Sequence, residues 1–301
     1  MRHLLFLVFL ITSSFSYNLG TLATASENGM YYKLGNEIAQ VLKKYDVDLE
    51  PITTAGSYEN LDILNNNIVD NKNTFFAIVQ KDAIQYYNYL QYVNTQKSIY
   101  HKIPAVLSLG TEQIHIITLD GNEYDFESQK EYTVYCGGQY GGSCISAQYI
   151  EQAYGFKFTY VNSEFENLID KLKDGSLDLI FSVIEAPAEK FQNFEGVKLV
   201  DLPTNFVMEE MYTHSTIKVD DYPFLSEDIH AFSVAKVLVT NLNDEKYAPV
   251  IENLVRILML NKEFLAKEYG EHWAKIDFYY TNYKKMSLPA KKVIESIDKF
   301  D

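Results

Sequence analysis

The stretch Thr54-Ala55-Gly56-Ser57-Tyr58-Glu59-Asn60-Leu61 opens a helical segment, and part of it returns later in the chain as Phe165-Glu166-Asn167-Leu168. Each copy is followed by a helix, a polar turn and an apolar strand, which is Phe75–Val79 in the first case and Leu179–Val183 in the second. A match of four residues can arise by chance, but the matching order of the surrounding elements argues against chance. The repeat therefore predicts two lobes with the same local topology.

Strand-like and helix-like segments alternate around both copies of this stretch. Strands are expected at 18–23, 48–52, 74–80, 132–136, 157–161 and 177–183, and helices at 31–44, 57–66, 143–154 and 164–173. This alternation predicts an α/β protein with a mostly parallel sheet and helices on both faces. The C-terminal part, with a strand at 235–240 and helices at 247–260, 262–266 and 291–299, has too few strands for a third domain.

The expected division of the chain follows from this pattern. Lobe 1 is expected to contain residues 17–118 and 214–301, and lobe 2 residues 119–213. Two connections would join the lobes, one at 114–119 and one within 206–232. Two strands that cross between lobes make a hinge, and ligands favour the cleft beside it.

The first residues, 1–16, have the pattern of a secretory signal peptide. A short basic start precedes the apolar run Leu4–Ile11, and Ser14 and Ser16 place small residues before a cut that would leave Tyr17 as the new N-terminus. The apolar run is too short to cross a bilayer, and the alternative is a buried first strand. The pattern predicts export to the periplasm as a soluble protein.

The charge and the residue types exclude several classes of function. The 301 residues carry 41 acidic and 26 basic side chains, a net charge of −15, so nucleic acid is a poor partner. After residue 16 the chain has a single arginine, Arg256, which makes an arginine–carboxylate clamp improbable. The six histidines lack metal-binding spacing, and no nucleophile–base motif is present, so we expect no catalysis, no metal and no cofactor.

Three loops precede predicted helices and are rich in small or hydroxylated residues, at 24–29, 53–57 and 137–143. Each would offer free backbone N–H groups and the positive end of a helix dipole, an arrangement that binds carboxylate or phosphate groups. For any one loop, an ordinary turn after a strand is the better explanation of this composition. Because all three loops occupy equivalent positions, anion binding becomes as good an explanation as turn formation for the set. The residues expected to bind ligand are Thr24, Ser26, Tyr31, Ser57 and Gln80 from lobe 1, and Gly138, Tyr140, Ser143 and Glu185 from lobe 2.

Some residues near these loops have more than one interpretation. Tyr31 is a candidate for core packing as well as for the site. Glu112 and His115 are left out of the site because a hinge role is an equal alternative. Cys136 and Cys144 form either a disulfide that would pin the third loop or two buried thiols.

Several motifs together resemble the TAXI family of solute-binding proteins, which serve TRAP transporters, over about residues 19–266. The matching segments are Gly29-Met30-Tyr31-Tyr32-Lys33-Leu34-Gly35, residues 54–61, Phe76-Ala77-Ile78-Val79-Gln80-Lys81-Asp82, Thr111-Glu112-Gln113-Ile114-His115, the loop 137–143, residues 173–181 and Pro187.

The resemblance implies a two-lobe periplasmic binding protein type II fold with two interlobe crossing strands. It also implies that a monomer captures a small organic anion or amino acid, such as glutamate or a dicarboxylate, and delivers it to a TRAP-type membrane permease. The alternatives are a sensor subunit that presents its ligand to a membrane receptor, and a periplasmic enzyme. The chain departs from the family pattern at Ala25, Glu27 and Asn28, and at Glu185, whose carboxylate would repel a dianion and suit a ligand ammonium.

Overall fold

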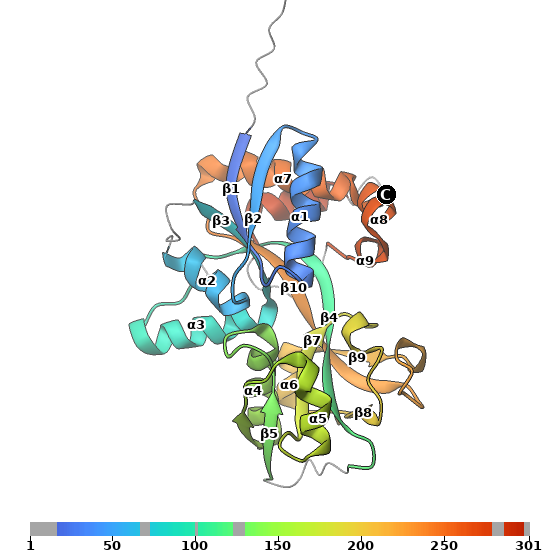
Figure 1. The fold of residues 1–301 in the computed structure, drawn as a ribbon. Coiled ribbons are helices and arrows are strands. Elements are labelled where there is room, and N and C mark those ends of the chain that lie inside the picture. Colours follow the sequence, from blue (N-terminus) through green and yellow to red (C-terminus); the bar gives the residue numbers. More distant parts are fainter. Residues whose placement is uncertain (1–16, 67–72, 100–101, 123–129, 279–285, 298–301) are drawn as a thin grey trace, which may run out of the picture.

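A computed structural model describes residues 17–66, 73–99, 102–122, 130–278 and 286–297 of the chain. The segment predicted to be a signal peptide, residues 1–16, lies outside the described residues. The chain forms two α/β halves, one above the other in Figure 1, and they meet at a narrower waist.

All the strands of the described ranges belong to one ten-stranded sheet with the order β2-β1-β3-β10-β4-β7-β5-β6, in which β8 also pairs with β4 and β9 with β10. The strands are β1 (Tyr17–Ala23), β2 (Val47–Ile52), β3 (Thr74–Gln80), β4 (Ala105–Leu119), β5 (Glu131–Tyr135), β6 (Lys157–Tyr160), β7 (Leu179–Ile184), β8 (Val197–Leu199), β9 (Thr213–Ile217) and β10 (Ile229–Thr240). β1 pairs in parallel with β2 and β3, and β5 pairs in parallel with β6 and β7, so each half has its own parallel unit.

Two long strands, β4 and β10, run through both halves and join them (Figure 1). They pair with each other in an antiparallel ladder, in which Leu238 lies opposite Leu107 and Ser233 lies opposite Gln113. Beyond this ladder, β10 pairs with β3 in the upper half and β4 pairs with β7 in the lower half. The expectation of two crossing strands is confirmed, although β10 crosses later in the chain than the sequence predicts.

Helices cover both faces of the upper half of the sheet. The helices of the protein are α1 (Met30–Lys43), α2 (Ser57–Asn66), α3 (Lys81–Thr95), α4 (Gly142–Tyr154), α5 (Leu168–Lys173), α6 (Phe206–Met211), α7 (Ala248–Leu260), α8 (Lys262–Tyr269), α9 (Glu271–Ala274) and α10 (Leu288–Ile297). α1 and α7 to α10 pack on one face, where Ile38 and Leu254 are buried against Leu22 of β1. α2 and α3 pack on the other, where Leu61 and Tyr87 are buried.

The single tryptophan of the chain belongs to the upper half. Trp273 is fully buried among the side chains of α1, α7 and α8. Its Nε1 donates a hydrogen bond of 2.7 Å to Oε2 of Glu37, a buried carboxylate of α1 that also lies 2.8 Å from His272 Nε2. This contact connects the C-terminal helices to α1. Such a connection is needed if the C-terminal part completes the first lobe, as predicted.

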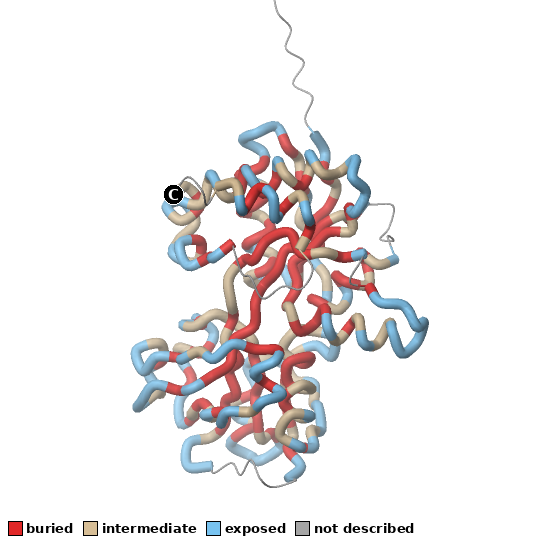
Figure 2. Tube along the Cα trace, turned by 180° about the vertical axis from the view of Figure 1, so that it is seen from behind, coloured by how far each residue is buried: buried red, intermediate tan, exposed pale blue. Residues whose placement is uncertain are grey.

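The lower half is built on the same plan. α4 and α6 cover one face of β5, β6 and β7, and α5 covers the other. Buried residues form a continuous band along the strands of both halves and through the waist (Figure 2). Because each buried aliphatic side chain contributes about 2 kcal/mol, both cores contribute substantially to stability.

The segment that follows α6 packs in the lower half. Ile217, Tyr222 and Ile229 are buried in the same cluster as Leu168 and Phe191. The sequence places residues from 214 onward in lobe 1, because the strand at 235–240 is the first clear signal of a return to the sheet. We therefore propose that lobe 2 extends into the first half of β10.

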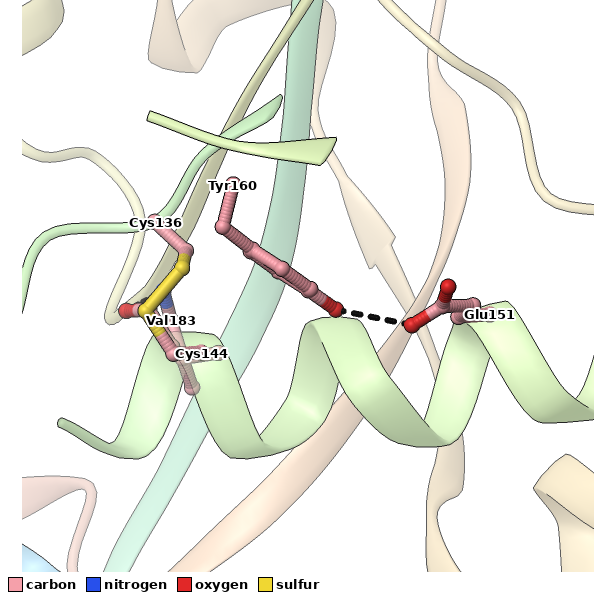
Figure 3. The surroundings of a disulfide bond; sticks show 6 residues. Cys136, Cys144, Glu151, Tyr160 and Val183 are labelled. Atoms are coloured by element: carbon pink, nitrogen blue, oxygen red, sulfur yellow. Dashed lines mark hydrogen bonds between the residues drawn. A yellow bond between two sulfur atoms is a disulfide. The ribbon is translucent and has the colours of Figure 1, made fainter. Parts of the chain in front are cut away.

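A disulfide joins Cys136, which follows β5, to Cys144 in the first turn of α4, with their Cα atoms 4.9 Å apart. Figure 3 shows the bridge above α4, beside Tyr160 and Glu151. The hydroxyl of Tyr160 donates a hydrogen bond of 3.1 Å to Glu151 Oε2, which connects β6 to the same helix. The bridge thus closes the glycine-rich loop 137–143 at both of its ends.

Replacing both cysteines with serine is expected to lower the free energy of unfolding. The bridge spans a sequence separation of 8, and closing a loop of that size in the unfolded chain corresponds to roughly 2.5 kcal/mol. Urea denaturation of the protein and of the variant, both purified under oxidising conditions, measures the difference. A mass increase of two hydrogen atoms on reduction is the accompanying control, and two free thiols in protein purified under oxidising conditions would contradict the bridge.

Candidate functional site

Asp82, in the first turn of α3, links the two halves. Its Oδ2 accepts hydrogen bonds from the hydroxyl of Ser146 in α4, at 2.6 Å, and from that of Tyr212 after α6, at 2.8 Å. Its Oδ1 accepts a third from the backbone N–H of Ala83 at 2.8 Å. All four residues are buried, and charge-assisted bonds of this length are strong. The carboxylate therefore holds the lower half against the upper one.

Two of the three predicted loops also meet between the halves. A Cβ atom placed on Gly56 would lie 3.6 Å from the Cα atom of Gly141, so the two backbones are close. The ring of Tyr140 packs against that of Tyr58, with their centroids 5.0 Å apart. Beneath this ring pair, Ile145 of α4 is buried in the apolar cluster of α2 and α3. The second and third loops thus form one contact surface.

Gln80, the last residue of β3, reaches across this surface to the start of α4. A Cβ atom on Gly142 would lie 1.2 Å from Gln80 Oε1, so only glycine leaves room for the amide. The backbone N–H of Gln80 donates to the Ser57 hydroxyl at 3.1 Å. The Nε2 atom of Gln80 is buried and has no hydrogen-bond partner among the described residues. A buried donor without an acceptor is unfavourable, which marks this position for a ligand atom.

Charged side chains gather next to Gln80. The hydroxyl of Tyr31 donates a hydrogen bond of 2.9 Å to Oε2 of Glu112 in β4. Nζ of Lys236 in β10 lies 3.1 Å from Oε2 of Glu185, which follows β7. Glu112 and Lys236 are buried, and Glu185 is half-buried. We call Tyr31, Gln80, Asp82, Glu112, Glu185 and Lys236 the waist cluster.

The waist cluster contains more acidic than basic groups, and its electrostatics reflect this. The pKa of Glu112 is raised to about 7, mainly by burial; Lys236 and the Tyr31 hydroxyl oppose this rise, and the carboxylates of Glu185 and Asp82 add to it. Burial, followed by the charge of Glu112, raises the pKa of Tyr31 well above its ordinary value, so this phenol remains a donor. The cluster can therefore both donate and accept protons in hydrogen bonds near neutral pH.

The structure places the predicted site residues in three kinds of position. Tyr31, Ser57, Gln80 and Glu185 lie in or beside the waist cluster, and the ring of Tyr31 also packs in the upper core. Thr24 and Ser143 instead bond to the backbone of their own halves, Thr24 to the carbonyl of Ile52 and Ser143 to the N–H of Val183. Ser26, Gly138 and Tyr140 are exposed, and of these Tyr140 contacts the other half.

Several members of the interlobe contact were missed by the sequence analysis. Asp82 stands in a segment that was recognised, but its neighbour Gln80 was chosen instead. Glu112 was set aside as a hinge residue. Lys236 interrupts the apolar run of β10, and a lone charge in a buried strand was a signal that could have found it. Ser146 has no such signal. His115, by contrast, belongs to the lower core, where burial lowers its pKa to about 4.

No group of three or more metal-binding side chains occurs within the residues that the structure describes. None of the helices within these ranges is both long and apolar enough to cross a membrane.

Comparison of the sequence with protein families gives one match. The model described as the NMT1-like family matches residues 22–272 of this chain, which include every member of the waist cluster. No curated protein matches the chain in sequence.

Three solved structures illustrate the likeness in fold. The periplasmic binding protein BugD has a TM-score of 0.52 at 12% sequence identity, over 94% of each chain. A structure described as a periplasmic transporter has a TM-score of 0.53 at 11% identity, also over 94% of each chain. YhfZ from Shigella flexneri has a TM-score of 0.51 at 15% identity, over 84% of this chain and 92% of its own. At these identities the likeness concerns the fold, and it confirms the predicted periplasmic binding protein fold.

Replacing Glu112 with glutamine is expected to change how stability depends on pH. The pKa of Glu112 rises from its ordinary value of 4.5 to about 7 in the folded protein, so the folded state binds the proton more tightly than the unfolded state. The stabilisation that the protonated carboxyl provides is complete below pH 4.5 and is lost as the pH rises to 7. Its magnitude is about 3 kcal/mol at most, since one pKa unit corresponds to 1.36 kcal/mol.

Urea denaturation of the wild type and of Glu112→Gln over this pH range measures the effect. The comparison cancels the titration of groups that do not interact with Glu112, whereas its coupling to the nearby charges of Asp82, Glu185, Lys190 and Lys236 is part of the measured difference. The stability of the wild type should fall relative to that of the variant as the pH rises. A difference that is constant with pH would contradict the shift.

The pair Gly142→Ala and Gly138→Ala tests the contact across the waist. A methyl group at position 142 collides with the Gln80 amide, whereas nothing lies within 4 Å of one at position 138. We expect the first variant to lose about 1–3 kcal/mol of stability and the second to change by less than about 0.5 kcal/mol. Both substitutions reduce the conformational entropy of the unfolded chain by a similar amount. The difference between the melting temperatures of the two variants therefore measures the effect of the contact between position 142 and the Gln80 amide. Equal melting temperatures would show that Gln80 does not occupy this position.

Proposed function

The chain belongs to the NMT1-like family, and we propose that it is an exported solute-binding protein which captures a small organic anion or amino acid between its lobes. The observation that carries this proposal is the waist cluster. It draws buried polar side chains from both halves and from both crossing strands to one place.

The hinge supports a binding role. Two strands join the halves, and the contacts between the halves include the polar bonds of Asp82, the Lys236–Glu185 ion pair, the Tyr58–Tyr140 ring pair and the Gln80 amide. Such contacts can open and reform, because they are small compared with the two apolar cores. A ligand that bonds to both halves would shift the molecule towards its closed form.

The chemistry of the cluster favours a ligand with both kinds of charge. Lys236 and the free Nε2 atom of Gln80 suit a carboxylate, while Glu112 and Glu185 suit an ammonium group. A dianion would meet three carboxylates and a single buried lysine in the cluster. An amino acid, which carries one carboxylate and one ammonium group, therefore fits better than a dicarboxylate. Of the ligands that the family resemblance implies, we thus favour amino acids.

Delivery to a membrane permease is the second part of the proposal. The resemblance to TAXI proteins favours a TRAP-type permease, and the signal-like residues 1–16 favour a periplasmic location. The disulfide between Cys136 and Cys144 supports export, because disulfides form and persist in oxidising compartments.

A thermal-shift panel of amino acids, monocarboxylates, dicarboxylates, phosphate and phosphonates tests the proposal. A specific ligand at one hundred times its dissociation constant should add about 2.7 kcal/mol of stability. We expect an amino acid to give the largest shift, and mass spectrometry should show that it is released unchanged. A panel without any shift, or a converted ligand, would overturn the solute-binding function.

Two tyrosine variants locate the binding. Tyr31→Phe removes the hydroxyl that bonds to Glu112, whereas Tyr32→Phe makes the same change on the next residue, which is only half-buried. Calorimetric titration with the best compound of the panel should show weaker binding for Tyr31→Phe and unchanged binding for Tyr32→Phe. Equal affinities in both variants would place the ligand elsewhere.

A further inference from the structure

Lys236 is a buried cation in an otherwise apolar strand. Its side chain is 2% exposed, and Ala235 and Val237 on either side are buried in the upper core. β4 has a bulge opposite Lys236, where Gly110 adopts a positive φ of 89° and lies in contact with the lysine side chain. Bulges of this kind often re-aim a side chain beside a functional site. The sheet is therefore locally distorted around this ammonium group.

The register places Lys236 beside the other donor of the cluster. Lys236 lies directly opposite Gln80 in the antiparallel pair of β10 and β3, and directly opposed residues share one face of a sheet with their Cβ atoms in contact range. Val234, two residues before Lys236 on the same face, lies opposite Glu112. The ammonium of Lys236, the free Nε2 of Gln80 and the carboxyl of Glu112 are thus neighbours on one surface.

Glu185 is the partner of Lys236 in this structure, and it comes from the other half. It follows β7, its side chain is 20% exposed, and its Oε2 lies 3.1 Å from the lysine Nζ. A buried cation that loses its partner is strongly destabilising, so Lys236 needs a carboxylate at every stage of binding. An incoming carboxylate can take the place of Glu185 without leaving the lysine uncompensated.

We propose that Lys236 and the Gln80 amide bind the carboxylate of the ligand, and that Glu185 is an internal carboxylate which occupies Lys236 until the ligand displaces it. This assignment rests on the proposed function and deepens it. Nζ and Nε2 offer donors to the two oxygens of one carboxylate. The displaced Glu185 then lies beside the ligand, where it can accept a hydrogen bond from an ammonium group, so the substrate class is an α-amino acid.

Chemical rescue tests the exchange without knowledge of the natural ligand. Glu185→Ala leaves Lys236 without its carboxylate, and the full-length variant should melt below the wild type. Sodium propionate, which supplies a small carboxylate in place of the one that the substitution removes, should raise its melting temperature in a saturable manner and more than that of the wild type. Propionamide, which has the same shape without the charge, and sodium chloride at equal ionic strength are the controls.

The double variant Glu185→Ala with Lys236→Met identifies the group that binds propionate. It removes both charges of the pair, so it is expected to fold and to gain nothing from propionate beyond the effect of chloride. A rescue that persists without the lysine, or that propionamide reproduces, would overturn the assignment. An equal rise in the wild type would overturn it as well.

Glu185→Gln provides a second route if the alanine variant does not fold. Glutamine keeps the shape of the side chain but competes less well for the lysine, so the best monocarboxylate of the panel, which has no ammonium group for Glu185 to bind, should bind more tightly than to the wild type. The affinity for its methyl ester should not rise. Weaker or unchanged binding of the carboxylate would contradict the displacement of Glu185. If no compound of the thermal-shift panel binds but propionate rescues Glu185→Ala, only the proposed function is overturned.

Discussion

The antiparallel pairing of β4 with β10 is the constraint on which the rest of the structure depends. These are the strands that belong to both halves, and every side chain near their crossing lies between two cores. Polar residues that are buried at this crossing, such as Glu112 and Lys236, are removed from bulk solvent, so they must satisfy one another or a ligand. The pairs Tyr31–Glu112 and Lys236–Glu185 both include a residue of these strands. The waist cluster is therefore a consequence of the topology.

Much of the fold could be predicted because its signals are local. The alternating segments and the repeated Glu-Asn-Leu element gave the α/β class, the two lobes and most element bounds to within a few residues. Helix α3 was missed because its tyrosines lie on several sides: Tyr87 is fully buried, whereas Tyr89 and Tyr92 are exposed. The lobe boundary that we propose lies later in the chain than the predicted one, because β9 has an exposed, polar pattern that gives no sign of its pairing with β10.

The site was only partly predictable, because it depends on contacts that are distant in sequence. Loop composition led to Ser57, which bonds to the backbone of Gln80, but it also led to Ser26 and Gly138, which are exposed. Asp82 is bonded to Ser146 and Tyr212, which lie 64 and 130 residues later in the sequence. Hydrophobic periodicity carries no information about contacts between residues so far apart in the chain. The ammonium that Glu185 was expected to meet in a ligand is already present in the protein as Lys236. A single sequence shows which charges exist, but not which of them are partners.

The position of the one tryptophan determines what fluorescence can report about this protein. Trp273 is buried between α1 and the C-terminal helices and bonds to Glu37, on the opposite side of the upper sheet from α2 and α3. If the lobes move as rigid bodies, the surroundings of Trp273 stay the same, so its emission should not change on opening or closing. Its emission should change when the upper core unfolds. The paired rings of Tyr58 and Tyr140, which belong to different lobes, are the natural optical probe of the movement itself.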